Sequence, residues 1–355
     1  MKILISGICG FVGSVLAGFL RESTPGIEIL GMDNLMRAGS ETNRRVLAGL
    51  GVKVIHGDIR CASDFEALPP VDWVLDAAAN PSVLAGVDGK SSSRQVIEHN
   101  LLGTVNLLEY CRRVSAGFIL LSTSRVYSIP ALAGVPLIVT GDRFTPDSSA
   151  PMPPGFGAAG LRENFSTAAP VSLYGATKLA SECLALEYGE AFKFPVRINR
   201  CSVMGGAGQF GTAEQGIFSY WLHAWKSGRP MRYIGFDGRG KQVRDVFHPR
   251  DLGRLVLAQI NDPGKIGPAI INAGGGLKNS MSLAELSAWC QDRFGVREVQ
   301  SDATPRRYDL PWIVMDNAAV SSLWNWQPEM TLPNLLDSIA EHVLANPQWL
   351  AVSGA

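Results

Sequence analysis

The chain lacks any imbalance of charge. Among its 355 residues, Lys and Arg together number 32 and Asp and Glu together number 32, so the formal net charge is zero. Proteins whose main partner is a nucleic acid carry a basic excess or a basic stripe that meets the phosphates. We therefore expect no nucleic acid partner, and any site for an anion must be built from a few local residues.

The sequence also lacks the cysteine and histidine patterns of metal sites and disulfide frameworks. Its six cysteines are scattered, with no CxxC pair and no cluster of histidines beside them. They are Cys9, Cys61, Cys111, Cys183, Cys201 and Cys290. Zinc sites and disulfide-rich folds both need regular spacing. We therefore expect no metal, and the scattered thiols suit a reducing compartment.

Long apolar runs are missing as well. No uninterrupted apolar stretch approaches the ~20 residues of a membrane span. After Lys2 a short apolar run leads directly into a glycine motif, which is not the pattern of a signal peptide. We expect a cytoplasmic protein without a membrane partner. Hydrophobic residues make up 46% of the chain, enough for a substantial core.

The first half of the chain alternates short apolar runs with segments of helical period. The runs predict strands at Lys2–Ser6, Glu28–Met32, Lys53–His56, Trp73–Asp76 and Gly117–Leu121, and the clearest helix between them is Gln95–Arg113. This alternation is typical of βαβ units stacked into an α/β Rossmann fold with a doubly wound parallel sheet. Apolar residues throughout each strand fit a sheet covered on both faces.

The regular pattern lapses between Tyr127 and Pro170, where proline and glycine crowd the chain. A loop of this length is usually a lid, a binding loop or a disordered insert, and we predict that it is mobile until substrate binds. A helix over Val171–Phe192 and a strand near Pro195–Asn199 follow. We predict one domain over residues 1–204, with an insert at 128–170, and a smaller C-terminal lobe over 205–355.

A glycine motif after the first predicted strand indicates a dinucleotide site. Gly7, Gly10 and Gly13 have GxxGxxG spacing before an amphipathic helix. Without a Cβ, the turn lets a pyrophosphate approach the positive N-terminus of the helix, although such triplets also occur in ordinary tight turns. Asp33 stands twenty residues after Gly13, where a carboxylate binds ribose hydroxyls and repels a 2′-phosphate. The spacing predicts that the domain over residues 1–204 binds NAD rather than NADP, although Arg37 lies nearby. The lobe over 205–355 would then mainly bind substrate.

Residues after the other predicted strands extend the predicted cofactor site. Asp58 stands where adenine would lie, with a turn or helix-capping role as its alternative. The small residues Ala77, Ala78 and Ala79 would let the cofactor lie against the sheet edge, although core packing explains them equally well. The other predicted contacts to NAD are Phe11, Val12, Asn34, Arg37, Ile59, Ser122 and Cys201.

Tyr174 and Lys178, in YGATK, are four residues apart and share one side of a helix. Tyrosine is a poor base at its free pKa of ~10, but a neighbouring ammonium favours the phenolate and lowers that pKa. The phenolate can take a proton from a substrate hydroxyl while hydride leaves the same carbon. Lys178 can also hold the nicotinamide ribose, and the alternative for the pair is an exposed helix face. Thr123, at the carboxyl end of the fifth strand, would hydrogen-bond the reacting oxygen or merely satisfy the strand end.

Together these motifs resemble the extended short-chain dehydrogenase/reductases, the NAD-dependent nucleotide-sugar epimerases and dehydratases, over nearly the whole chain. The matching segments are GICGFVG, MDNLMRAG, HGDIR, HNLLGTVNLLE, LSTSRVY, YGATK, VRDVFHPRDL, RRYD and LWNWQP. The resemblance implies Thr123, Tyr174 and Lys178 as the catalytic set and Asn100 as a structural asparagine beside the cofactor. It also implies a homodimer with a four-helix interface, to which Leu101–Arg113 and Val171–Phe192 would contribute.

Within this family, GGAGQFGTAEQG and GKQVRDVFH most resemble the cytidine-diphosphate tyvelose (paratose 2-) epimerases. The resemblance implies a nucleotide-diphosphate sugar as substrate. Its implied contacts are Asn80, Thr123, Gln209, Gln215, Arg244 and Arg306. The two arginines would bind the diphosphate, because a planar guanidinium can hold two oxygens; ordinary surface ion pairing is their alternative. Three parts of the chain near the sugar pocket differ from the family pattern. They are the segment DAAANPS, Val203 and the insert.

The residues after Thr123 bear on the type of reaction. Family dehydratases have an Asp-Glu pair there that eliminates water, whereas this chain has Ser124 and Arg125, so elimination lacks its acid and base. We predict epimerisation through a transient ketone, at C2 of a CDP-hexose, with a UDP-sugar 4-epimerase as the alternative. An NAD-dependent sugar dehydrogenase or reductase and a non-catalytic NAD-sensing protein on the same fold also remain open.

Overall fold

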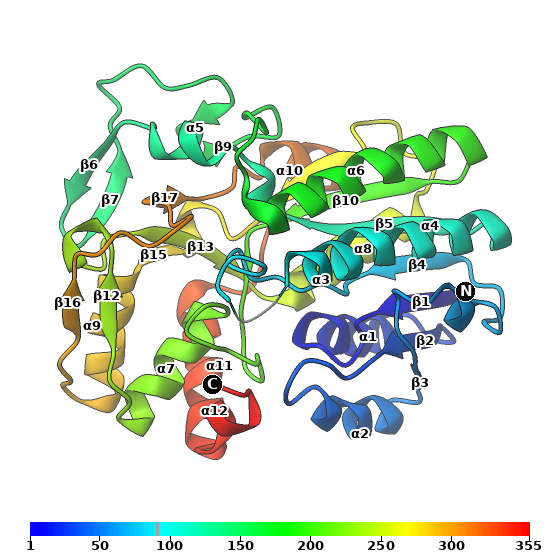
Figure 1. The fold of residues 1–355 in the computed structure, drawn as a ribbon, viewed down its shortest axis with the longest axis horizontal. Helices are drawn as coiled ribbons and strands as arrows, with labels where there is room; N and C mark the ends of the chain where they lie inside the picture. The colour runs from blue at the N-terminus through cyan, green and yellow to red at the C-terminus, as the bar shows by residue number, and fades with distance from the viewer. Residues whose placement is uncertain (90–91) are drawn as a thin grey trace.

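A parallel sheet of seven strands forms the centre of the molecule (Figure 1). The computed structural model describes residues 1–89 and 92–355. The strand order is β14-β10-β5-β4-β1-β2-β3. The strands are β1 (Lys2–Ser6), β2 (Glu28–Asp33), β3 (Lys53–His56), β4 (Trp73–Asp76), β5 (Gly117–Thr123), β10 (Val196–Cys201) and β14 (Ile270–Ala273). The predicted doubly wound Rossmann sheet is confirmed, because each predicted strand lies in it.

Helices cover both faces of this sheet. They are α1 (Phe11–Ser23), α2 (Glu41–Gly49), α3 (Ser93–Ile97), α4 (Gly103–Val114), α6 (Ser172–Phe192), α8 (Pro249–Asn261) and α10 (Ala318–Trp324). Along β1, Ile3 and Ile5 belong to the core with α1 and α8, whereas Leu4 belongs to the core with α4 and α6. Because both sets of side chains are buried, the strands are apolar along their length. A π-helical stretch, Glu98–Leu102, joins α3 to α4.

The smaller lobe packs at one end of the sheet (Figure 1). Its helices are α7 (Ile217–Ser227), α9 (Leu283–Phe294), α11 (Leu332–Ala345) and α12 (Trp349–Val352), and its strands are β11 (Val203–Met204), β12 (Arg232–Ile234), β13 (Val243–Phe247), β15 (Ser280–Ser282), β16 (Gln300–Asp302) and β17 (Trp312–Ile313). The boundary predicted at residue 204 marks only the first crossing into this lobe, because α8, β14 and α10 return to the central sheet. No helix in the described parts of the chain is long and apolar enough to cross a membrane.

The insert at 128–170 is folded, which excludes the disordered insert among the three predicted alternatives. It contains α5 (Ile129–Ala133) and two hairpins, β6 (Leu137–Thr140) with β7 (Arg143–Pro146) and β8 (Phe156–Gly157) with β9 (Gly160–Leu161). Phe156 and Phe165 are buried, and Phe156 packs on Trp312 with ring centroids 5.2 Å apart. The aromatic residues between the prolines and glycines therefore build a small core with the other lobe. Movement of the insert on substrate binding stays a prediction.

A buried ion pair joins the sheet to α6. Arg200 on β10 and Glu182 on α6 lie 2.7 Å apart and are almost fully buried. Ser122 Oγ, on β5, donates to the same carboxylate, and Arg200 Nη1 donates to the Glu163 carbonyl oxygen of the insert at 3.0 Å. Buried charges are tolerated only when each finds its partners. The pair therefore holds α6, two strands and the insert in one arrangement.

We expect Glu182→Gln to lower the free energy of unfolding by about 3–5 kcal/mol, because the guanidinium of Arg200 would stay buried without its counter-charge. Urea unfolding followed by circular dichroism measures this loss. Glu190→Gln is the matched control, since Glu190 pairs with Lys193 at the exposed end of the same helix and should leave stability unchanged. Equal stability of the two variants would contradict the role given to the buried pair.

Candidate active site

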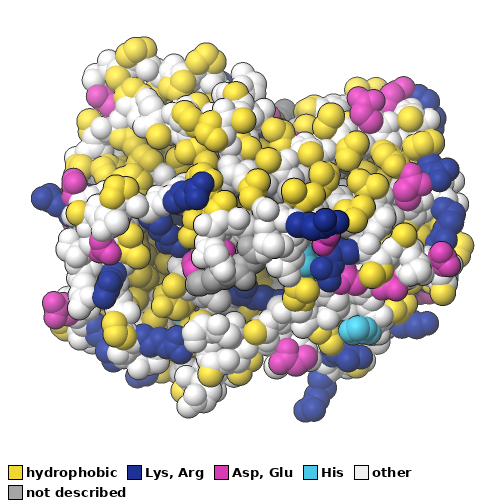
Figure 2. All heavy atoms as spheres, in the orientation of Figure 1, with side chains coloured by type: hydrophobic (Ala, Val, Ile, Leu, Met, Phe, Trp, Pro, Cys, Tyr) yellow, Lys and Arg dark blue, Asp and Glu magenta, His cyan; other side chains and the backbone are white. Residues whose placement is uncertain are grey.

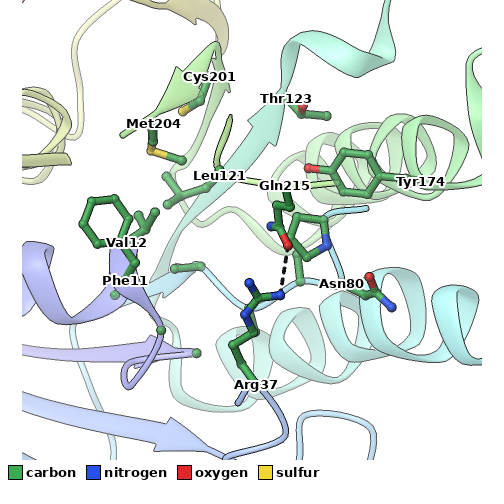
Figure 3. Close-up of a pocket in the computed structure, with 18 of the residues that line it drawn as sticks. Phe11, Val12, Arg37, Asn80, Leu121, Thr123, Tyr174, Cys201, Met204 and Gln215 are labelled. Carbon is green, nitrogen blue, oxygen red and sulfur yellow. Dashed lines mark hydrogen bonds between the residues drawn. The ribbon is translucent and has the colours of Figure 1, made fainter. Parts of the chain in front are cut away.

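A cavity of about 550 Å³ runs along the carboxyl ends of the sheet strands. The glycine turn after β1, the ends of β2, β4, β5 and β10, and α6 all contribute to its wall (Figure 3). The predicted cofactor residues in this wall are Gly7, Gly10, Phe11, Val12, Gly13, Asp33, Asn34, Arg37, Ile59, Ala77, Ala78, Ala79, Ser122, Tyr174, Lys178 and Cys201. The predicted substrate contacts Asn80, Thr123, Gln209, Gln215 and Arg244 line it too.

The glycine turn leaves no room for side chains. Gly7 has φ +64°, and a Cβ on it would lie 2.8 Å from the Ala78 Cα, while a Cβ on Gly13 would lie 2.4 Å from the Gly7 carbonyl oxygen. The turn precedes the N-terminus of α1, so backbone and helix dipole together form a cradle for a pyrophosphate. Asp33 accepts hydrogen bonds from the backbone N–H groups of Cys9 and Leu35, each at 2.8 Å, and burial raises its pKa. These residues fit a dinucleotide.

Three predicted contacts lie outside this wall. Asp58 forms an ion pair with Arg60, whose Nη2 lies 2.6 Å from Oδ2, and hydrogen bonds from Arg60 hold the pKa of Asp58 well below its usual range. Asn100 is buried behind the wall, where its Oδ1 accepts from the Asn80 backbone N–H at 2.7 Å. This contact suits the structural role that the resemblance implies. Arg306 lines a second, neighbouring cavity.

Thr123, Tyr174 and Lys178 meet in the first cavity, from β5 and from one side of α6. All three side chains are buried, so the alternative of an exposed helix face does not apply. Burial raises the pKa of Tyr174 to about 12, although a hydrogen bond with Thr123 and the charge of Arg125 lower it. The net direction is therefore opposite to the predicted lowering of this pKa, since desolvation outweighs the favourable contacts.

Arg125 is a site residue that the sequence analysis used only to argue against dehydration. It lines both cavities, and its Nη2 donates to the Tyr308 carbonyl oxygen at 2.5 Å. Burial lowers its pKa to about 10, and the nearby charges of Arg244 and Arg306 lower it too. The feature of the sequence that could have identified Arg125 as a site residue is its position two residues after Thr123, at the carboxyl edge of the sheet.

The second cavity, of about 230 Å³, adjoins the first, and Arg125, Gln215 and Arg244 line both. The described part of its wall contains four arginines and two carboxylates. The arginines are Arg125, Arg244, Arg306 and Arg307, and the carboxylates belong to Glu214 and Asp309. Arg244 Nη2 pairs with Asp309 at 2.8 Å. Apolar residues from α7 and α9 complete the wall. Figure 2 shows this face hollowed over the smaller lobe, with basic side chains around the hollow. Such a cavity suits a ligand with both an anionic and an apolar part.

Arg37 bridges the outer wall of the cofactor cavity. Its Nη1 donates to Gln215 Oε1 at 3.1 Å (Figure 3), and its Nη2 donates to the Phe210 carbonyl oxygen. Phe210 in turn stacks on Trp349 of α12, with ring centroids 5.3 Å apart. The guanidinium of Arg37 is therefore hydrogen-bonded to the loop of the smaller lobe that contains Phe210 and Gln215. Gln215, which the resemblance places at the substrate, contacts Arg37 in this structure.

Comparison with known proteins agrees with this geometry. Residues 3–274 match the model of the NAD dependent epimerase/dehydratase family. The chain belongs to this family. It is thus an NAD-dependent enzyme of the nucleotide-sugar epimerase and dehydratase group, which confirms the predicted enzyme class and cofactor.

Individual relatives differ in the reaction that their names give. CDP-paratose 2-epimerase of Salmonella typhi is 30% identical over 93% of this chain and 96% of its own length. dTDP-glucose 4,6-dehydratase of Salmonella typhimurium is 26% identical over 99% of this chain and 94% of its own. Among solved structures, a variant of UDP-glucuronic acid 4-epimerase from Bacillus cereus, bound to UDP-4-deoxy-4-fluoro-glucuronic acid and NAD, has a TM-score of 0.78 and 22% identity. It covers 97% of this chain and 99% of its own, and it shows the shared fold.

We expect Arg37→Met to release NAD at least about tenfold faster, because two hydrogen bonds to the charged guanidinium across the cavity mouth would be lost. NAD should stay preferred over NADP. The measurement is the dissociation rate of NAD by stopped-flow fluorescence, with Arg45→Met as the control because Arg45 lies exposed on α2. Faster NADP binding without faster NAD release would assign Arg37 to phosphate recognition instead.

Proposed function

We propose that this protein epimerises a nucleotide-diphosphate sugar by oxidising one sugar carbon to a transient ketone and reducing it from the other face. The observation that carries the proposal is the meeting of Thr123, Tyr174 and Lys178 in the cofactor cavity, directly beside a basic second cavity. NAD, when bound, supplies the acceptance and return of hydride. The sugar would lie at the junction of the cavities, with the nucleotide in the second one.

Each of the three side chains has a distinct part in this proposal. Thr123 Oγ1 would hydrogen-bond the reacting sugar oxygen, and Tyr174 Oη would exchange a proton with that oxygen. Lys178, only 2% exposed, would hold the nicotinamide ribose and place its charge close to the phenol. Burial of the whole set keeps water away from the ketone until it has turned over.

The residues that follow Thr123 argue against dehydration. Ser124 and Arg125 occupy the two positions after Thr123 and carry no carboxylate. Asp33 and Asp245 do line the cavity. Asp33 accepts hydrogen bonds from the glycine turn, whereas Asp245 Oδ2 accepts one from the Gly276 backbone N–H at 3.0 Å and its Oδ1 has no hydrogen-bond partner among the described residues. Elimination therefore lacks the Asp-Glu pair that family dehydratases have after Thr123.

The substrate that we propose is a CDP-hexose inverted at C2. It is supported by the similarity to CDP-paratose 2-epimerase and by the position of Gln209 in the cavity wall. In the second cavity the buried Gln242 Oε1 has no hydrogen-bond partner among the described residues, so an N–H donor of the base, such as the 4-amino group of cytosine, would satisfy it. Arg125, Arg244 and Arg306 would bind the diphosphate.

We also propose that the protein is a homodimer that pairs through α4 and α6. Leu102, just before α4, and Phe192, at the end of α6, are large apolar side chains that are 43% and 48% exposed. Covering such residues in a subunit interface would remove apolar surface from water.

Proton NMR of the products tests the substrate. The NAD-loaded enzyme is incubated in turn with CDP-hexoses and UDP-hexoses, and the configuration at each sugar carbon is followed. We expect inversion at C2 of a CDP-hexose without net NADH formation. Inversion only at C4 would move the protein to the UDP-sugar 4-epimerases, and net NADH release without inversion would support a dehydrogenase.

We expect Tyr174→Phe to lower kcat by about 10²–10⁴-fold, because the proton donor and acceptor at the reacting oxygen is lost. Folding and NAD binding should be unchanged. Tyr188→Phe is the control, since Tyr188 lies on the same helix and its hydroxyl donates to Glu109 outside the cavity. Thermal unfolding and NAD titration accompany the rate measurement. Near-normal turnover of Tyr174→Phe would exclude Tyr174 as the acid and base.

A further inference from the structure

A buried histidine lies at one end of the cofactor cavity, where the sequence analysis assigned it no role. His99 lies in the π-helical stretch between α3 and α4 and is 8% exposed. It lines the same cavity as Asn34, Gly57 and Ile59, and Gly103, four residues after it, packs against Ile59. A π-helical turn changes the direction of side chains along a helix and is frequent at functional sites.

This end of the cavity belongs to the adenosine half of the dinucleotide. Its other wall residues follow β2 and β3, and β3 lies four strand positions from β5, which carries Thr123. At about 4.8 Å between neighbouring strands, the two ends are roughly 19 Å apart. Since Thr123 and Tyr174 mark the nicotinamide end, and Asp33 stands where the adenosine ribose would bind, His99 would lie on the adenine side when NAD is bound.

The hydrogen bonds of His99 decide which ring nitrogen carries the proton. Nδ1 lies 2.8 Å from the Gln95 carbonyl oxygen, which can only accept, so Nδ1 is the donor. In the neutral ring Nε2 is therefore an acceptor. Nε2 is buried and has no hydrogen-bond partner among the described residues. A buried acceptor without a donor is costly, and because His99 lines the cavity, a ligand N–H group that reached Nε2 would remove this cost.

The carboxylate that the sequence analysis placed at adenine is already engaged. Arg60 Nε and Nη2 donate to the two oxygens of Asp58 at 2.9 and 2.6 Å. Asn34 Nδ2 donates to Asp58 Oδ2 at 3.0 Å. Asp58 is also absent from the cavity wall, whereas His99 is part of it.

We propose that His99 Nε2 accepts a hydrogen bond from the 6-amino group of the adenine of NAD. The contact makes the site selective for adenine over a purine that carries a carbonyl oxygen at this position, because two acceptors would then face each other. Ile59 and Ala78 supply apolar surface for the ring in the same wall. His99 is thus a specificity residue for the cofactor, independent of which sugar the enzyme acts on.

Nicotinamide hypoxanthine dinucleotide tests this role, since it differs from NAD by a carbonyl oxygen in place of the 6-amino group. Isothermal titration of the ligand-free protein gives the Kd of each dinucleotide. We expect the wild type to bind NAD at least tenfold more tightly than the hypoxanthine form. His99→Phe should bind NAD more weakly and lose this preference. His99→Gln, which restores an acceptor oxygen, should keep part of it.

Two controls accompany this binding experiment. Thermal unfolding of the ligand-free variants reports whether His99→Phe disturbs the fold, and the preference ratio is compared only between dinucleotides on the same variant. Asp58→Asn should leave the ratio unchanged. Equal binding of both dinucleotides to the wild type would overturn the proposal, and so would a ratio that survives His99→Phe but collapses in Asp58→Asn. Because only binding is measured, the result is separate from the proposed epimerisation.

Discussion

The arrangement of the site depends on the buried ion pair between Arg200 and Glu182. Tyr174, Lys178 and Glu182 are spaced by four residues along α6, so they share one side of the helix. Arg200 and Ser122 bind Glu182 to β10 and β5, which directs the same side of the helix at the carboxyl end of the sheet. Arg200 also holds the Glu163 carbonyl oxygen of the insert. One desolvated pair thus sets the rotation of α6 and the position of the insert.

The two cavities differ in the charged groups of their walls, and this difference suits them to different tasks. Burial raises the pKa of Tyr174 to about 12, and a hydrogen bond with Thr123 lowers it in part. The second cavity has more arginines than carboxylates in its described wall, which suits phosphate oxygens. Arg125 lies in both walls and lowers the pKa of Tyr174. It therefore links anion binding to the reacting group.

Local sequence patterns predicted the elements that depend on neighbours in the chain. Strands β1 to β5 follow continuous apolar runs, and Gly7 and Gly13 occupy positions where a Cβ would collide with backbone. The fold of the insert was not predicted, because its prolines and glycines mark turns, while Phe156 and Phe165 find their packing partner in the distant Trp312. The adenine contact of Asp58 stays a prediction from its position after β3, and the direction of its carboxylate depends on Arg60 and Asn34.

The sequence by itself determined the Rossmann fold, the dinucleotide motif and the identity of the YGATK pair, because each depends on short-range periodicity or on a fixed spacing. The tertiary structure decided which side chains share a cavity. Arg37 meets Gln215 across 178 positions in the chain, and Arg125 meets the Tyr308 carbonyl oxygen across 183. Whether a buried group such as His99 Nε2 has a partner also depends on every element around it. Contacts of this kind arise only when distant segments pack together, and a one-dimensional pattern does not record them.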